Sequence, residues 1–133
     1  DFRINHFGSN KKLPNSIKMI IDDVQKNTSK NKGMQINLAF NYSGREEIKH
    51  AIKKLIKYRK NIDKFETYLY TNNIPDPELI IRTGGEYRMS DFLLWQSAYS
   101  ELFFTKILWP DFKFINLKKS LNDFLKRNRN YGR

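Results

Sequence analysis

The chain has 133 residues, 39% hydrophobic and 29% charged, which is the mix of an ordinary globular domain. The absence of cysteine excludes a disulfide framework and a cysteine-based metal site, and no apolar run approaches the length of a membrane span. The net charge of +11 favours an anionic partner, such as nucleic acid, anionic lipid headgroups or diphosphates. A solvated, lysine-rich surface explains the same charge, and we weigh it above a nucleic-acid footprint.

The first half of the chain alternates strand and helix patterns. Residues 3–7 read as a short strand, and apolar residues at helical spacing follow Pro14: Ile17, Ile20, Ile21 and Val24. Residues 34–42 place apolar or aromatic side chains at every second position, which predicts a strand. Ser43 and Glu46 then form a capping-box pattern in front of a second apolar helical stripe, which predicts a helix: Ile48, Ala51, Ile52, Leu55 and Ile56.

The second half repeats the alternation less regularly. A weakly helical stretch, 61–73, ends at two prolines, and the wholly apolar run 79–81 predicts a strand buried on both faces. Residues 92–99 are apolar all round and predict a buried helix, and 102–104 read as a further strand. Asn116 is expected to cap a last helix with four inward residues: Leu117, Leu121, Phe124 and Leu125.

This alternation indicates an α/β fold with a largely parallel sheet flanked by helices. Such sheets bind ligands outside the carboxyl ends of their strands. Two loops, 43–45 and 82–90, are therefore expected on one edge of the sheet as candidate binding loops. Arg45, in the first loop, either pairs with a carboxylate at the helix start or belongs to the active-site edge, and we favour a structural or supporting role.

The loop 82–90 is the most informative segment for chemistry. Gly84 and Gly85 let the backbone turn sharply after a strand. Arg82 and Arg88 offer planar forks that match phosphate geometry, and Ser90 adds a hydroxyl at an expected helix start. These residues could form a cradle for a diphosphate.

The same loop has a structural interpretation. Its arginines could pair with Glu86 and Asp91 in an ordinary turn, and residue chemistry alone does not separate the two readings. No Walker-type or GxGxxG loop is present, so ordinary nucleotide-binding loops are not supported.

Residues 81–112, IRTGGEYRMSDFLLWQSAYSELFFTKILWPDF, resemble the isopentenyl-diphosphate-binding segment of the cis-prenyltransferases, the undecaprenyl diphosphate synthase family. Residues 36–48 resemble its central strand–turn–helix block, and residues 126–132 its basic C-terminal end. The resemblance implies that residues 1–133 are the C-terminal portion of a single isoprenyl transferase domain, incomplete at the N-terminus. It also implies cis-condensation of isopentenyl diphosphate onto an allylic diphosphate to make a polyprenyl diphosphate.

The resemblance also assigns site residues. Four residues are expected to bind the diphosphate of isopentenyl diphosphate: Arg82, Arg88, Met89 and Ser90. Glu101 is expected to hold Mg²⁺. No catalytic residue is assigned, because the family's Asp-Gly-Asn-Arg loop has no counterpart here, and the chain alone is expected to be inactive. Three positions depart from the family: Asp91 replaces the usual Asn, Ser43 a common Gly, and Asn130 the usual Arg, for which Arg129 or Arg133 could substitute.

The resemblance implies a homodimer, a cytoplasmic protein with peripheral membrane contact during product release, and a product that serves as a cell-wall carrier lipid. Several apolar residues are assigned to the core or the dimer interface: Phe92, Leu94, Trp95, Tyr99, Phe103 and Phe104. His6 and His50 are isolated, and His50 is expected in solvent. Two alternatives stay open: a non-catalytic partner subunit of the family and, less favoured, a basic nucleic-acid-binding module.

Overall fold

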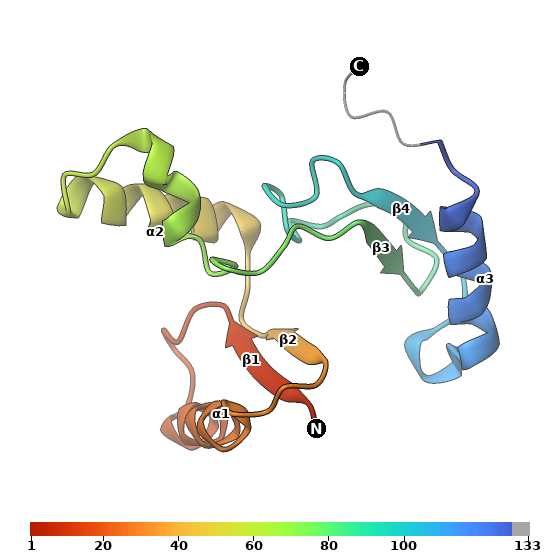
Figure 1. Cartoon of the computed structure of the whole chain (residues 1–133), viewed down its shortest axis with the longest axis horizontal. Coiled ribbons are helices and arrows are strands. Elements are labelled where there is room, and N and C mark those ends of the chain that lie inside the picture. The colour runs from red at the N-terminus through yellow and green to blue at the C-terminus, as the bar shows by residue number, and fades with distance from the viewer. Residues whose placement is uncertain (129–133) are drawn as a thin grey trace. The chain divides into compact units, whose positions relative to one another are not determined.

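The structure is a computed structural model that describes residues 1–128. The chain forms two compact units, unit 1 (Asp1–Ile74) and unit 2 (Pro75–Arg133), each of which is described by itself. Figure 1 colours the elements of both units in chain order.

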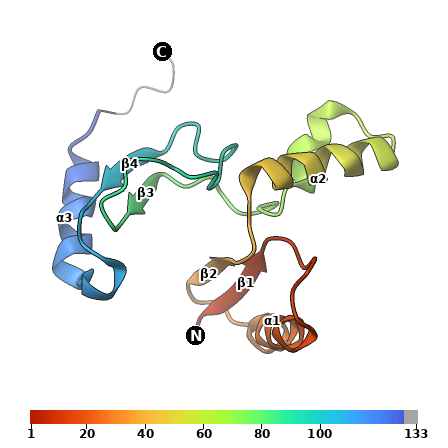
Figure 2. The same ribbon diagram turned by 180° about the vertical axis from the view of Figure 1, so that it is seen from behind.

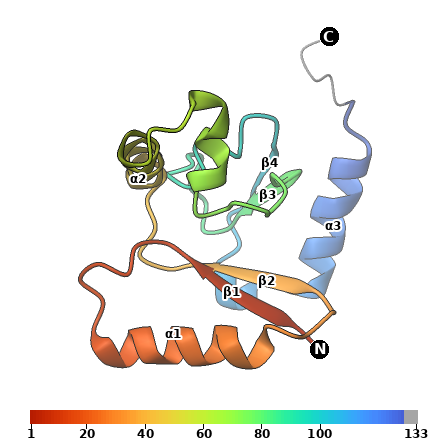
Figure 3. The same cartoon turned by 60° about the vertical axis from the view of Figure 1, so that its left-hand side comes forward.

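Unit 1 begins with a parallel strand pair connected through a helix. Strands β1 (Arg3–Phe7) and β2 (Gln35–Ala39) pair in parallel, and α1 (Asn15–Thr28) is the crossover between them. Figure 3 shows α1 lying along this two-stranded sheet. The Thr28 hydroxyl at the end of α1 accepts a 3.1 Å hydrogen bond from the Ile4 N–H, which ties the helix to β1.

The rest of unit 1 consists of α2 (Gly44–Lys57) and the 3₁₀ helix η1 (Ile62–Tyr68). The Ser43 side chain accepts a 3.3 Å bond from the Glu46 N–H, so the expected cap is confirmed. Helical spacing places Ala51 and Leu55 on one face of α2, and they form a small buried cluster with Phe65 and Leu69. This cluster packs η1 against α2.

Unit 2 contains a second parallel pair, β3 (Leu79–Arg82) and β4 (Glu101–Phe104), in register from Leu79↔Glu101 to Arg82↔Phe104. The 3₁₀ helix η2 (Trp109–Asp111) and α3 (Phe114–Leu125) follow. Figure 2 shows β3 and β4 side by side. Parallel strands and helices together confirm the predicted α/β class.

Some local expectations were wrong. The strand at 79–81 is half-buried instead of buried on both faces, because its sheet has two strands in the described part of the chain. Residues 92–99 form turns instead of a buried helix, with the backbone of Ser90, Asp91 and Leu93 at positive φ. A residue at positive φ leaves the right-handed helical conformation, so a regular helix cannot start here.

The apolar helical faces are also less covered than expected. No residue of α1 is buried, and Leu121 and Leu125 of α3 are exposed instead of inward-facing. The helix α3 starts two residues before Asn116, whose side chain accepts a 2.8 Å bond from the Lys113 N–H. No helix among residues 1–128 combines the length and apolar character needed to cross a membrane.

Candidate functional site

The loop after β3 is held by backbone hydrogen bonds to the segment after β4. The Gly84 N–H donates to the Ile107 carbonyl and the Gly85 N–H to the Thr105 carbonyl, both at 2.9 Å. Both glycines have positive φ, 91° and 81°. A side chain at either position would strain the backbone, so the sequence needs glycine to turn the chain here.

Arg82 bonds to the C-terminal end of this loop. Its guanidinium Nη1 donates a 3.0 Å hydrogen bond to the Ser90 hydroxyl oxygen and a further bond to the Arg88 carbonyl oxygen. The structure therefore brings three of the four predicted diphosphate-binding residues into one turn. The fourth, Met89, lies half-buried between Arg88 and Ser90.

Arg88 makes an ion pair with Glu86, with 2.5 Å between Nη1 and Oε2. Both side chains are about half exposed or more, 64% and 48%. An exposed ion pair of this kind contributes about 0–1 kcal/mol, so an anion with better geometry can displace Glu86. The structural interpretation of the loop predicted this ion pair. The role of Arg88 in ligand binding stays a prediction.

Ser90 does not begin a helix. It lies with Asp91 at positive φ in a turn, where the Phe92 N–H donates to the Met89 carbonyl at 3.1 Å. The helix N-terminus expected to favour an anion at Ser90 is therefore absent from this part of the described chain. The groups of the loop that suit an anion are therefore the guanidinium groups of Arg82 and Arg88 and the hydroxyl of Ser90.

Glu101, the predicted metal ligand, opens β4 opposite Leu79. At roughly 3.3 Å per residue, it lies about 10 Å along the strand pair from Arg82, so the backbone does not place it in the same turn as the arginines. Its Oε2 accepts a 2.8 Å bond from Nη1 of Arg127, which also bonds to the Leu102 carbonyl and to Asp123.

Sequence reasoning did not single out Arg127, which contacts the predicted metal ligand Glu101. The hydrogen bonds to Glu101 and then to Asp123 raise the pKa of its guanidinium. Arg127 follows α3 and lies 26 positions from Glu101, and no periodicity connects residues so far apart. The only available signal was its place in the basic C-terminal end.

Glu101 can act as a single carboxylate ligand. Magnesium takes hard oxygen ligands and uses one or two carboxylates together with phosphate oxygens. Among residues 1–128, Arg127 bonds to Oε2 and leaves Oε1 available, but no group of three His, Asp or Glu side chains could hold a metal. The donor set therefore fits Mg²⁺ only if a bound phosphate completes its coordination.

The remaining predicted positions are placed as follows. Arg45 is exposed in the first turn of α2. His50 is half-buried and stacks on Tyr70 at 5.0 Å between ring centroids, so the expectation that it is solvated was wrong. Arg129, Asn130 and Arg133 lie outside the described residues.

The apolar residues assigned to the core or an interface divide into two sets. Phe103 and Phe104 are half-buried in β4. The other four are exposed, which excludes a core role within this chain for Phe92, Leu94, Trp95 and Tyr99. Their role at an interface stays a prediction.

The family can be assigned from comparison with known proteins. Residues 1–132 match the family model described as "Putative undecaprenyl diphosphate synthase". The chain belongs to the undecaprenyl diphosphate synthase family. Among curated members, it is 47% identical to an isoprenyl transferase of Treponema denticola, over 99% of this chain and 60% of that protein.

Two further members of the undecaprenyl diphosphate synthase family illustrate its range. The chain is 44% identical to a tritrans,polycis-undecaprenyl-diphosphate synthase (geranylgeranyl-diphosphate specific) of Thermoplasma acidophilum, over 91% of this chain and 50% of that protein. A crystal structure of lavandulyl diphosphate synthase from Lavandula x intermedia in complex with dimethylallyl diphosphate matches with a TM-score of 0.93. That match has 33% identity and covers 100% of this chain and 61% of the other. The chain thus spans 50–61% of the length of these three relatives.

Proposed function

We propose that this chain supplies the isopentenyl-diphosphate site of a cis-prenyltransferase, which condenses isopentenyl diphosphate with an allylic diphosphate to make a polyprenyl diphosphate. Family membership supports the reaction class. The observation that best supports the site is that Arg82 bonds to both Ser90 and the Arg88 carbonyl. These bonds bring two arginines and a hydroxyl group into one turn. The relatives are named for prenyl transfer or for synthesis of prenyl diphosphates, in agreement with this class.

In this proposal the guanidinium groups bind and orient the diphosphate. Arg88 exchanges the Glu86 carboxylate for phosphate oxygens, because a charge-assisted, two-point bond to phosphate is stronger than an exposed ion pair. Ser90 donates its hydroxyl proton to a phosphate oxygen while its own oxygen still accepts from Arg82. The glycine backbone at 84 and 85 lets the ligand approach closely.

Glu101 is proposed to hold Mg²⁺ through its free carboxylate oxygen. When bound, the metal would neutralise negative charge on diphosphate oxygens. Arg127 fixes the orientation of Glu101 through the bond to Oε2. The residues of this chain thus bind and orient substrate, and the chain alone is proposed to be inactive because no counterpart of the family's catalytic Asp loop occurs in it.

The assembly proposed for the protein is a homodimer formed through this region. The exposed aromatic and aliphatic residues of unit 2 support it, because large exposed apolar patches mark interaction surfaces. Peripheral contact with a membrane is proposed for release of the lipid product.

The test is calorimetric titration of isopentenyl diphosphate, with Mg²⁺, into the purified chain and into three variants. Arg88→Ala should weaken binding by about tenfold or more, because it removes a hydrogen bond to a charged group. Arg88→Lys should recover only part of the affinity, since lysine keeps the charge but loses the planar fork. Lys118→Ala, an exposed residue of α3, is the control for net charge and should bind like the parent chain.

Equal binding by the Arg88→Ala chain would contradict the proposed site. Absence of binding by a folded parent chain would also contradict it, and would favour the alternative of a non-catalytic partner subunit. Circular dichroism of each variant separates loss of folding from loss of the site.

A further inference from the structure

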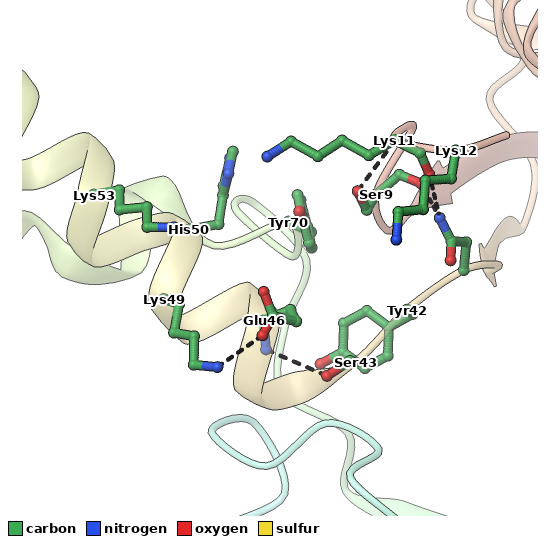
Figure 4. Close-up of a pocket in the computed structure, with 11 residues that line it drawn as sticks. Ser9, Lys11, Lys12, Tyr42, Ser43, Glu46, Lys49, His50, Lys53 and Tyr70 are labelled. Atoms are coloured by element: carbon green, nitrogen blue, oxygen red, sulfur yellow. Dashed lines mark hydrogen bonds and ion pairs between the residues drawn. The ribbon is translucent and has the colours of Figure 1, made fainter.

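Unit 1 contains a basic pocket that the proposed function does not use. The pocket has a volume of about 280 Å³ and lies where the loops after β1 and β2 meet the first turns of α2. Eleven residues line it: Ser9, Lys11, Lys12, Asn41, Tyr42, Ser43, Glu46, Lys49, His50, Lys53 and Tyr70. In Figure 4 the Lys11 side chain extends from the first loop toward His50 on α2. The pocket shares no residue with the loop 82–90.

The loop that carries Lys11 and Lys12 is fixed in place. The Asn41 amide donates to the carbonyl oxygens of Ser9 at 2.5 Å and Lys11 at 3.0 Å, and the Ser9 N–H donates back to the Asn41 carbonyl. Both Asn41 and Lys12 have positive φ, 51° and 63°. For a lysine this conformation is unfavourable and persists only where the surrounding structure imposes it. The fold thus maintains a strained loop that presents two cationic side chains.

The charges in the pocket are only partly neutralised by the chain, through Glu46. Lys49 is paired with Glu46 at 2.8 Å, but within residues 1–128 no ion pair includes Lys11, Lys12 or Lys53. Three positive charges therefore remain in one small cavity. Like charges held together repel one another, so a bound polyanion would stabilise this arrangement.

The same positive charges affect the pKa of His50. Burial lowers the pKa of His50, and the positive charges of Lys54, Lys11 and Lys53 lower it further, against a smaller opposing effect of Glu47. The imidazole is thus kept from adding a further positive charge while the pocket is empty of anions.

One wall of the pocket is rigid. Glu47, 1% exposed, accepts a 2.5 Å bond from the Tyr42 hydroxyl and a 2.7 Å bond from the Tyr70 N–H. His50 stacks on the Tyr70 ring. The buried carboxylate therefore positions two of the aromatic residues against which a ligand would rest.

We propose that this pocket is a second anion site and that it binds a diphosphate group. The volume lies just under the lower end of small-molecule sites, which suits a compact ligand and leaves no room for a long prenyl chain. The three unpaired lysines match the charge of a diphosphate better than that of a single phosphate. Two sources share this chemistry: free inorganic pyrophosphate, and the diphosphate end of a prenyl ester whose chain extends out of the pocket. The proposal of this second site does not rest on the proposed function. Only the suggestion that its ligand is a prenyl ester rests on it.

The experiment is calorimetric titration of the full chain, without metal, with inorganic pyrophosphate, with orthophosphate and with dimethylallyl diphosphate. Pyrophosphate should bind saturably and more tightly than orthophosphate. The double variant Lys11→Gln with Lys53→Gln should weaken pyrophosphate binding by about tenfold or more. The matched variant Lys26→Gln with Lys30→Gln removes the same charge from exposed positions outside the pocket and should change binding by less than about twofold.

Comparison of the three ligands and of the variants separates the possible outcomes. Tighter binding of dimethylallyl diphosphate than of pyrophosphate identifies the ester as the ligand, and the reverse identifies free pyrophosphate. Equal weakening by the two double variants, or no saturable binding to a folded chain, overturns the proposal. A third double variant, Arg82→Ala with Arg88→Ala, should leave pyrophosphate binding in this pocket intact. Failure of the isopentenyl-diphosphate site is thereby distinguished from failure of this one.

Discussion

The two units hold the loop that follows their first strand in different ways. Each has a pair of parallel strands and a loop held at the carboxyl end of that pair. In unit 2 two glycines make the turn, and their N–H groups bond to the segment after β4. In unit 1 the asparagine side chain at 41 holds the loop, and a lysine occupies the strained conformation.

The cationic groups of the two loops also differ in their partners. Arg88 pairs with a carboxylate and Arg82 bonds to a hydroxyl and a carbonyl, so both guanidinium groups of loop 82–90 have partners without a ligand. Lys11 and Lys12 have no such partner among residues 1–128. A ligand of the first loop must compete with internal bonds, which favours geometric selectivity. A ligand of the second loop encounters free charge, which favours affinity for any compact polyanion.

The largest expected effect tests how each loop is built. Gly8, at φ 145°, would place an added Cβ 2.2 Å from the Phe40 carbonyl oxygen, whereas Gly84, at φ 91°, has no atom within 4 Å of an added Cβ. Gly8→Ala should therefore destabilise the fold by about 3 kcal/mol or more, through backbone displacement. Gly84→Ala should cost about 1–2 kcal/mol, through conformation alone. Urea unfolding of both variants measures the difference, and equal losses would show that steric contact does not hold the loop of unit 1.

The next effect concerns pH. The pKa of His50 is lowered below its usual value of 6.5, so the unfolded chain binds a proton there that the folded chain does not. Stability contributed by neutral His50 is present above pH 6.5 and is lost as the pH falls through the lowered pKa. Titration of the His50 ring by NMR should show this low pKa, and saturating pyrophosphate should raise it.

Substitutions of lysine give the matched comparison for this titration. Lys11→Gln should raise the pKa of His50 because it removes one repelling charge, and Lys26→Gln should leave it unchanged. A pKa of His50 that does not respond to Lys11→Gln would mean that the two side chains do not share a pocket in solution.

The smallest effect concerns the internal ion pair of loop 82–90. Glu86→Gln should leave unfolding within about 0.5 kcal/mol of the parent chain, since the pair is exposed. Release of Arg88 should tighten binding of isopentenyl diphosphate by about two- to fivefold, the equivalent of such a pair. Weaker binding in the same titration would show that Glu86 orients Arg88 instead of competing for it.

Local sequence patterns predicted the regular elements of this fold because their signals lie within a few residues. Ser43 and Glu46 are three positions apart, and the apolar alternation of β2 needs only a short segment. Residues 92–99 were misjudged because their apolar composition was taken for helix burial. Their backbone follows a turn at Ser90 and Asp91 instead, and composition carries no information on φ.

The candidate sites divide in the same way. The residues of loop 82–90 were recognised because they lie close together in sequence and match family motifs. The bond from Arg127 to Glu101 and the pocket around Lys11 and His50 join residues 26 or more positions apart, which only the tertiary fold brings together. The lysine-rich helix around His50 predicts a solvated side chain, and no local pattern indicates its stacking on Tyr70, which lies 20 positions away.

A single substitution of Asn41 can change both the shape and the charge of the basic pocket. Aspartate, which a single nucleotide change can produce, has nearly the same size but no N–H to donate. Placed at position 41, its oxygens would face the carbonyl oxygens of Ser9 and Lys11, and its charge would oppose the lysines. One conservative-looking replacement would thus release the loop and lower the net positive charge of the pocket at the same time.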